Sequence, residues 1–370
     1  MVFVFGVIIA ASCIISFIIV AQVLALANKK SWYDPIDDRK IHTGEVPRLG
    51  GIGFASAFIG ISFGITVIIP LLPVQILPGS SLHLPFLFPL IAMLLIFVFG
   101  VFDDFRPMAA RYKLLIQVIA AFLVLIPGYS FRGILFVDFG ILGTLIWLRY
   151  PLTFLWIVGL TNAVNLIDGV DGLAGGISAL AAVFFALIFA FIAHNSAMAL
   201  ICLCLAASLV GFLIFNMPFP RARIFMGDGG SQFLGFILAL IPLMYTYGRS
   251  ADLGPSSFPL LYAAALLAIP IFDTFAAIWR RLRDGRRIHK PDRLHIHHKL
   301  LNLGLSARGV DAVLYSLQVI LGVLVFESLR FRGTRSLIFL GAAYMAVTGF
   351  FVTIHYMNRA VLRKRKAPSA

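Results

Sequence analysis

Long apolar runs separated by short polar segments fill the chain, and their lengths predict helices that cross a membrane. A helix needs about 20 mostly apolar residues to span the hydrocarbon core. The runs that approach this length lie at 1–27, 51–70, 86–102, 112–127, 151–168, 173–193, 196–216, 231–246, 257–279, 309–328 and 335–357. The pattern predicts an all-α polytopic membrane protein with about eleven transmembrane helices. We expect one integral-membrane domain over 1–357 and a basic tail over 358–370.

Composition agrees with this fold class, and the charges set its orientation. The 370 residues are 61% hydrophobic and 12% charged, with a mean hydropathy of +0.98, whereas soluble domains carry about 25% charged residues. The net charge of +14 comes from lysines and arginines in short loops, where such residues set topology. With the N-terminus outside, the cytoplasmic segments hold 24 of the 30 lysines and arginines. We therefore predict an external N-terminus, a cytoplasmic C-terminus and no nucleic-acid partner.

The polar motifs gather on one side of the predicted membrane. In this topology they lie on the cytoplasmic face, at 34–51, 103–104, 161–176, 216–231 and 280–299. A transporter needs polar groups near the middle of the membrane. The one-sided distribution instead favours an enzyme that joins a water-soluble substrate to a membrane lipid, with its active site on the cytoplasmic face. A transporter of lipid or nucleotide is the distant alternative.

The stretch TNAVNLIDGVDGLAGG places two amides and two carboxylates after an apolar run. Asn162, Asn165, Asp168 and Asp171 recur every three positions, and each such step falls about 60° short of a full helical turn. All four can face one ligand only if the helix ends near the glycines of this stretch, with Asp171 in a tight turn after it. Ionisable groups at such depth are usually functional. Polar contacts between helices are the alternative.

Asp103 and Asp104 are adjacent carboxylates at the end of an apolar run. Such a pair repels itself unless a cation or a proton lies between the carboxylates, so it suits Mg²⁺ or proton removal. The sequence leaves open which of the two acts as a base and which supports a metal, and a solvated helix end is the alternative. The cations that follow, including Lys113, could face phosphate.

Asp228 stands between glycines in FMGDGGS, just before a predicted helix. The glycines let a ligand approach the backbone, and a helix N-terminus offers N–H groups to an anion. Because a carboxylate and a phosphate need a cation between them, Asp228 is interpreted as a metal ligand. A helix N-cap is the alternative. Phe225 could stack on a nucleobase, although a core position is the more common role for phenylalanine.

The basic loop 280–299 ends in the motif HIHH. His297 and His298 are adjacent and no cysteine lies near them, which suits a tetrahedral zinc ion poorly. We interpret His295, His297, His298 and Arg293 as donors to a diphosphate, since imidazolium and guanidinium groups offset charge on phosphoryl oxygens. A loop that only sets topology would explain the arginines but not the histidines.

Five segments occur along the chain in a fixed order. They are DPIDDRKIHTGEVPRLGGIGF (34–54), DD (103–104), TNAVNLIDGVDGLAGG (161–176), FNMPFPRARIFMGDGGSQFLG (215–235) and PDRLHIHH (291–298). Together they resemble the polyprenyl-phosphate N-acetylhexosamine-1-phosphate transferase superfamily (glycosyltransferase family 4), in its WecA/TagO-like branch. The phospho-MurNAc-pentapeptide translocases of this superfamily carry three consecutive histidines instead of HIHH, which argues against the pentapeptide substrate.

The resemblance implies a reaction, and makes the 1–357 domain catalytic. Undecaprenyl phosphate attacks a UDP-N-acetylhexosamine, by default UDP-GlcNAc, and UMP leaves. The product, undecaprenyl-diphospho-sugar, begins a cell-envelope glycan such as O-antigen lipopolysaccharide or teichoic acid. The implied cofactor is Mg²⁺, with Mn²⁺ as a substitute, and the implied location is the bacterial inner (cytoplasmic) membrane, as a homodimer. FucNAc, QuiNAc and MurNAc-pentapeptide donors stay open as alternatives.

The resemblance also implies roles for individual residues. Asp228 matches the principal metal ligand, with Asn165 as a second. The implied catalytic residues are Asp103, Asp104, Asp168, His295, His297 and His298. The implied substrate-binding residues are Arg48, Lys113, Asn162, Asp171, Asn216, Phe225 and Arg293, with Asp171 and Phe225 on the uracil.

Two other classes compete with this interpretation. A CDP-alcohol phosphotransferase would carry a DG…AR…G…D…D pattern, which does not occur around 168–176. A transporter would show inverted repeats, which the sequence lacks. Release of UMP in detergent, where no gradient exists, would exclude a pure transporter.

Overall fold

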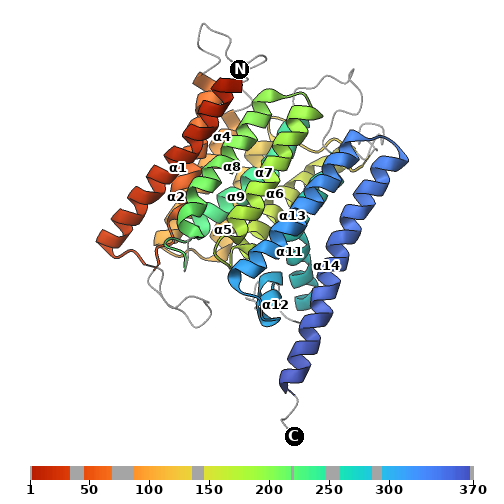
Figure 1. Ribbon diagram of the computed structural model, residues 1–370. Helices are drawn as coiled ribbons and strands as arrows, with labels where there is room; N and C mark the ends of the chain where they lie inside the picture. Colours follow the sequence, from red (N-terminus) through yellow and green to blue (C-terminus); the bar gives the residue numbers. More distant parts are fainter. Residues whose placement is uncertain are drawn as a thin grey trace.

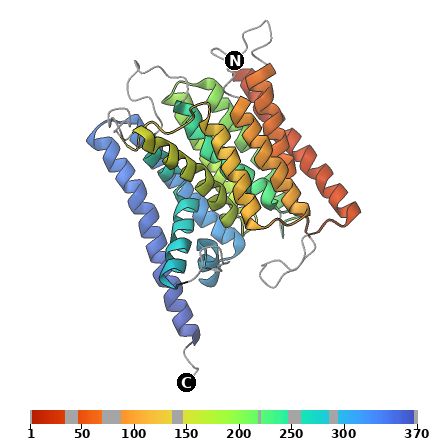
Figure 2. The same cartoon turned by 180° about the vertical axis from the view of Figure 1, so that it is seen from behind.

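The computed structural model describes residues 2–33, 46–68, 87–135, 146–217, 221–246, 259–285 and 294–366. The regular elements of these ranges are helices, and Figures 1 and 2 show them as one bundle. Along the chain they are α1 (Val2–Lys30), α2 (Gly50–Phe63) with the π-turn η1 (Gly64–Ile68), α4 (Leu87–Phe105), α5 (Ala110–Leu125), α6 (Arg149–Ile167), α7 (Leu173–Phe191), α8 (Ser196–Asn216), α9 (Gly227–Thr246), α10 (Leu260–Leu266), α11 (Ala268–Arg283), α12 (Ile296–Asn302), α13 (Ala307–Arg330) and α14 (Thr334–Lys366).

The predicted apolar runs are helical. Among the described residues nine helices are long and apolar enough to cross a membrane, and the pair α10–α11, bent by 90°, is a tenth candidate. The remaining predicted run coincides with α5, which has only 16 residues. The all-helical, polytopic membrane architecture is thus confirmed. The count of eleven spans and the orientation in the membrane stay predictions.

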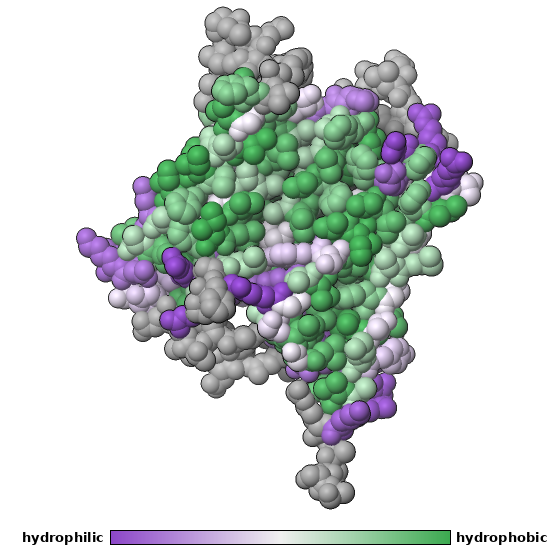
Figure 3. Space-filling model, in the orientation of Figure 1, coloured by the Kyte–Doolittle hydropathy of each residue, from purple (hydrophilic) through white to green (hydrophobic). Residues whose placement is uncertain are grey.

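The outer surface of the bundle is apolar along its length. Figure 3 shows hydrophobic residues over the flank of the bundle and hydrophilic residues near its two ends. Of the membrane-length window of α1 only 17% is buried, whereas 89% of the corresponding window of α9 is buried. Helix α9 is therefore the centre of the bundle, and α1 presents its side chains to lipid.

Glycines bring three helices into backbone contact with the beginning of α9. A Cβ added at Gly100 of α4 would lie 2.6 Å from Gly229 Cα, and one added at Gly51 of α2 would meet the backbone of Gly230. Further along α9, a Cβ at Gly235 would lie 2.7 Å from the Cα of Thr161 on α6. Small residues permit this close approach between membrane helices. The first half of α9 is consequently held between α2, α4 and α6.

The two ends of the described chain lie at opposite ends of the bundle. Helix α1 begins at the end marked N in Figure 1, and α14 runs past the rest of the bundle at the end marked C. The projecting part of α14 carries Arg359, Arg363 and Lys364. The predicted boundary between domain and tail at 357/358 falls inside this continuous helix.

Candidate active site

Asp228, in the first turn of α9, forms ion pairs with two cationic side chains. Arg48 Nη2 donates to its Oδ1 at 3.1 Å, and Lys113 Nζ donates to its Oδ2 at 2.5 Å. Asn165 Nδ2 on α6 lies 3.4 Å from the same Oδ1. The Asp228 side chain is 18% exposed, so a ligand can reach it. Predicted residues from four distant segments therefore meet on one accessible carboxylate.

A short backbone pairing places Arg48 beside Asp228. Phe225 N–H donates to the carbonyl of Pro47 at 2.8 Å, and the Phe225 carbonyl accepts from Gly50 N–H at 2.8 Å. The pairing joins the segment before α2 to the segment before α9. Phe225 is predicted to contact the uracil. Its backbone forms both hydrogen bonds of this pairing, next to Arg48.

Lys113 bridges two carboxylates. Its Nζ lies 2.5 Å from Asp103 Oδ2 on α4 and 2.5 Å from Asp228 Oδ2 on α9. The other oxygen of Asp103 accepts from Met108 N–H at 2.6 Å. Two carboxylates this close repel each other without a positive charge between them. The two carboxylates therefore create a site for a positive charge, which the ammonium group of Lys113 occupies.

The donor set around that position suits Mg²⁺. It offers the carboxylate oxygens of Asp103 and Asp228. Asn165 contacts this site through its Nδ2, which donates to Asp228 Oδ1 at 3.4 Å and to Ser231 Oγ at 2.8 Å. Mg²⁺ prefers oxygen ligands and is usually held by one or two carboxylates together with substrate phosphates. In the described part of the chain no three His, Cys, Asp or Glu residues form a metal-binding group. The substrate would therefore supply the remaining ligands.

Asp104 has a different position from its neighbour Asp103. Its two oxygens accept hydrogen bonds from the backbone N–H groups of Asp228, at 2.6 Å, and Gly229, at 3.0 Å. A carboxylate at this place satisfies free N–H groups at the start of α9 and complements the helix dipole. Asp103 thus faces the cation position, whereas Asp104 holds the backbone that carries Asp228.

Asn162 takes part in a buried amide cluster. Its Nδ2 donates to Gln117 Oε1 at 2.6 Å and to the Val158 carbonyl at 2.8 Å. Gln117 Nε2 in turn donates to Gln232 Oε1 at 3.1 Å. The cluster links α5, α6 and α9 about one turn away from Asn165. Asn162 therefore lies beside the carboxylate site and stabilises the helices that form it.

The turn between α6 and α7 follows the predicted geometry. Helix α6 ends at Ile167, Asp168 is its C-cap, and Gly172 adopts the left-handed conformation with φ 86°. Asp171 lies in the turn, and its Oδ2 is 3.4 Å from the N–H of Ala222. The predicted end of the helix is confirmed. Helix α6 stops at Asp168, whose φ of −74° and ψ of 59° are not helical, and Gly172, which takes positive φ without strain, is the N-cap from which α7 begins.

Asn216 fastens this turn to the segment before α9. Its Oδ1 accepts from Gly172 N–H at 2.8 Å, and its Nδ2 donates to the Ile224 carbonyl at 2.9 Å. The side chain is buried. Both polar groups of this predicted substrate contact are thus engaged with backbone that shapes the site.

The histidine motif lies against the same turn. A Cβ at Gly169 would lie 2.6 Å from His297 Nε2, so the imidazole packs on the glycine directly after Asp168. His295 Nδ1 lies 2.8 Å from Asp273 Oδ2, and Asp273 Oδ1 accepts from the N–H of Ile296 at 2.7 Å. The fold thus unites the two motifs as the sequence predicts. Arg293 lies outside the described residues.

His297 is a neutral imidazole in this environment. Burial, reinforced by the nearby His298, lowers the pKa of His297 to about 3. Its Nδ1 is buried and has no hydrogen-bond partner among the described residues. The expected imidazolium charge is therefore absent from His297 in the free protein near neutral pH. The physical reason is that the ring lies away from water, where a charge is poorly solvated.

Sequence reasoning missed Asp273 and Gln117. Both lie within predicted membrane runs and both are buried, Asp273 at 2% exposure. A signal was present, because an ionisable residue in a membrane helix is a functional candidate by default. Asp273 stands alone in the run 257–279, outside every motif, and was overlooked for that reason.

The sequence resembles known membrane transferases. The model of the family described as "Glycosyl transferase family 4" matches residues 86–246. The chain is 35% identical to the probable undecaprenyl-phosphate N-acetylglucosaminyl 1-phosphate transferase of Bacillus subtilis, over 83% of this chain and 80% of the relative. It is 30% identical to the undecaprenyl-phosphate alpha-N-acetylglucosaminyl 1-phosphate transferase of Escherichia coli K12, over 76% and 72%. It is 29% identical to the decaprenyl-phosphate N-acetylglucosaminephosphotransferase of Mycobacterium leprae, over 94% and 89%.

The matched segment runs from α4 to α9, and so contains the acidic residues that meet at the start of α9. The relatives and this segment show that the chain belongs to glycosyl transferase family 4, among its polyprenyl-phosphate N-acetylhexosamine-1-phosphate transferases.

Proposed function

We propose that this protein transfers GlcNAc-1-phosphate from UDP-GlcNAc to undecaprenyl phosphate, in a Mg²⁺-dependent reaction at the cytoplasmic face of a bacterial inner membrane. An oxygen of the lipid phosphate attacks the β-phosphorus of UDP-GlcNAc, the bond from that phosphorus to the bridging oxygen breaks, and UMP leaves with that oxygen. The observation that carries the proposal is that the carboxylates of Asp103 and Asp228 share one cationic group, the Lys113 ammonium, at an accessible site. The names of the relatives supply the sugar and the lipid.

The charges explain why such a site suits the reaction. Both substrates are phosphates and repel each other, so catalysis consists mainly of positioning and charge stabilisation. Bound Mg²⁺ would neutralise the diphosphate and the departing UMP. Arg48 and Lys113, which now neutralise Asp228, are the cationic side chains at hand for phosphate oxygens. A lipid phosphate is already ionised at neutral pH, so a strong general base is not required.

The bent pair α10–α11 favours a lipid substrate at this site. Its helices meet at 90°, and α11 exposes Phe275, Trp279 and Leu282 at 66%, 71% and 58%. Asp273, which holds the histidine segment, lies on the same helix. A polyprenyl chain in the membrane can therefore approach along α11 while its phosphate reaches the polar end of the bundle. The homodimer stays a prediction.

The test is UMP release by the purified protein in detergent, with undecaprenyl phosphate and UDP-GlcNAc, with and without Mg²⁺. We expect release with Mg²⁺, loss with EDTA, and recovery with Mg²⁺ or Mn²⁺. Asp228→Asn should abolish release, whereas the matched control Asp284→Asn, at the exposed end of α11, should leave it unchanged. Decaprenyl phosphate is the second acceptor, because the mycobacterial relative is named for it. Full release of UMP in the presence of EDTA would contradict the metal assignment. Failure to release UMP from UDP-GlcNAc and from every other UDP-N-acetylhexosamine would contradict the reaction.

A further inference from the structure

A buried carboxylate on α13 has no role in the site described so far. Asp311 is 3% exposed, and neither of its oxygens has a hydrogen-bond partner among the described residues. Burying an ionisable group without partners is costly, and in native proteins such a group calls for an explanation. Asp311 lies in the second turn of α13, at the end of the bundle that carries Asp228 and the histidine motif.

Asp311 adjoins the turn that follows α6. A Cβ at Gly172 would lie 3.2 Å from Asp311 Oδ2 and 2.7 Å from the sulfur of Met217. One helical turn beyond Asp311, Tyr315 OH donates to the Gly172 carbonyl at 2.5 Å. Gly172 directly follows Asp171. The unpartnered carboxylate is therefore one residue removed from a predicted nucleotide contact.

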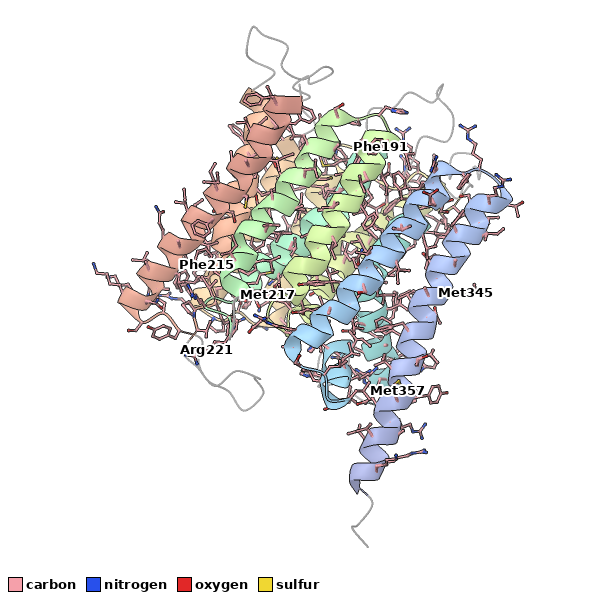
Figure 4. The ribbon with its side chains drawn as sticks, viewed as in Figure 1. Phe191, Phe215, Met217, Arg221, Met345 and Met357 are labelled. Carbon is pink, nitrogen blue, oxygen red and sulfur yellow. The ribbon has the colours of Figure 1, made fainter. Side chains whose placement is uncertain are left out.

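Met217 lies beside the same glycine as Asp311, because a Cβ at Gly172 would meet both side chains. This side chain is 39% exposed, and Figure 4 shows it at the end of α8, on the side towards α7 and α13. Methionine has three rotatable bonds and adapts its shape readily. Displacement of this flexible, partly exposed side chain is the route that we infer for a ligand group towards Asp311.

The chemistry of the carboxylate selects the ligand. A carboxylate without a hydrogen-bond partner can accept hydrogen bonds and repels phosphate, so it suits a part of the UDP-sugar that carries O–H groups. Two free oxygens on one carboxylate match two hydroxyls on adjacent carbons. We propose that Asp311 is a specificity-determining residue that binds a vicinal diol of the nucleotide sugar. This inference rests on the proposed function. The diol is either that of the ribose or that of the hexosamine.

The experiment compares wild type with Asp311→Asn and Asp311→Ala, by equilibrium binding and by UMP release. The ligands are UDP-GlcNAc, its 2′-deoxyribose analogue and its 4-deoxyhexosamine analogue. Losing a hydrogen bond to a charged group weakens binding by about tenfold or more, so we expect Kd and KM for UDP-GlcNAc to rise by that factor with little change in kcat. Ser316→Ala, on the exposed face of α13, is the matched control and should bind as wild type does.

The analogues identify the diol. If wild type and Asp311→Asn bind the 2′-deoxy analogue equally, the ribose diol is the ligand, and equality with the 4-deoxy analogue assigns the hexosamine. Because the variants remove a buried carboxylate that has no hydrogen-bond partner among the described residues and that is repelled by Asp171, their Tm should equal or exceed that of wild type. Equal affinities of wild type and both variants for UDP-GlcNAc would overturn the proposal, as would a lowered Tm with unchanged Kd, or an altered Mg²⁺ requirement alone. Failure of the proposed function would instead appear as absent UMP release by wild type, and the binding comparison would still test Asp311.

Discussion

The side-chain Oδ1 of Asp104 on α4 accepts a hydrogen bond from the backbone N–H of Asp228 on α9, with a distance of 2.6 Å. This contact joins the end of one helix to the start of another, and it fixes the backbone from which the Asp228 carboxylate projects. The neighbouring Asp103 reaches the same carboxylate through the ammonium of Lys113. Two adjacent acids therefore serve one site in two ways, one through the backbone and one through charge.

Replacing Asp104 should lower stability and activity together. Removing a capping side chain costs about 0.5–2 kcal/mol, and the first turn of α9 would lose the contact that positions Asp228. We expect Asp104→Ala to reduce both Tm in detergent and UMP release, and Asp103→Asn to reduce release with a smaller change in Tm. Asp104→Ala with wild-type Tm but no release would place Asp104 at the chemistry instead.

The glycine contact between α4 and α9 gives a second prediction. A methyl group at Gly100 would lie 2.6 Å from Gly229 Cα, so Gly100→Ala must push the two helices apart. Overpacking of this kind costs about 1–3 kcal/mol. We expect a lower Tm and reduced UMP release. Gly60→Ala on α2 is the control, because nothing lies within 4 Å of the added methyl group. Wild-type behaviour of Gly100→Ala would contradict the close packing.

Asp273 should act as a positioning residue for His295. A carboxylate on Nδ1 keeps the proton on that nitrogen and leaves Nε2 directed elsewhere. In Asp273→Asn the amide can present its N–H₂ group to the ring and reverse the tautomer. We expect kcat to fall by about 10–100-fold, with a shifted pH profile, and ¹⁵N NMR of labelled histidine to report the changed tautomer. In a His295→Ala background, Asp273→Asn should cause no further fall in kcat. A fall as large as that seen with His295 present would refute the coupling between the two residues.

The buried His297 makes stability depend on pH. Its pKa is about 3 in the folded protein and about 6.5 in an unfolded chain. As pH falls, the unfolded chain binds a proton on this ring before the folded protein does. The contribution of the neutral ring to the free energy of unfolding is therefore complete above pH 6.5 and is lost progressively towards pH 3. We expect Tm to fall less steeply between pH 7 and 4.5 in His297→Gln than in wild type. The exposed His194→Gln should follow wild type, and parallel curves for all three proteins would contradict the low pKa.

The sequence by itself determined the membrane class, the positions of the helices and the end of α6 near Asp168. These are local properties. The length of an apolar run decides whether a helix can cross lipid, and a glycine that accepts positive φ permits a tight turn between two helices. The motifs also contained Arg48 and Asn165, which meet at Asp228, and Lys113 was among the cations that follow the Asp103–Asp104 pair.

Only the tertiary structure decided how these residues divide their work. Whether Asp104 faces a substrate or a helix N-terminus depends on where α9 lies, and that depends on the contact of Gly100 with Gly229. The burial that keeps His297 neutral, and the isolation of the Asp311 carboxylate, likewise arise from neighbours far away in sequence. Hydrogen bonds and desolvation act over a few ångströms in space, so a residue's partners become known only when the helices are packed.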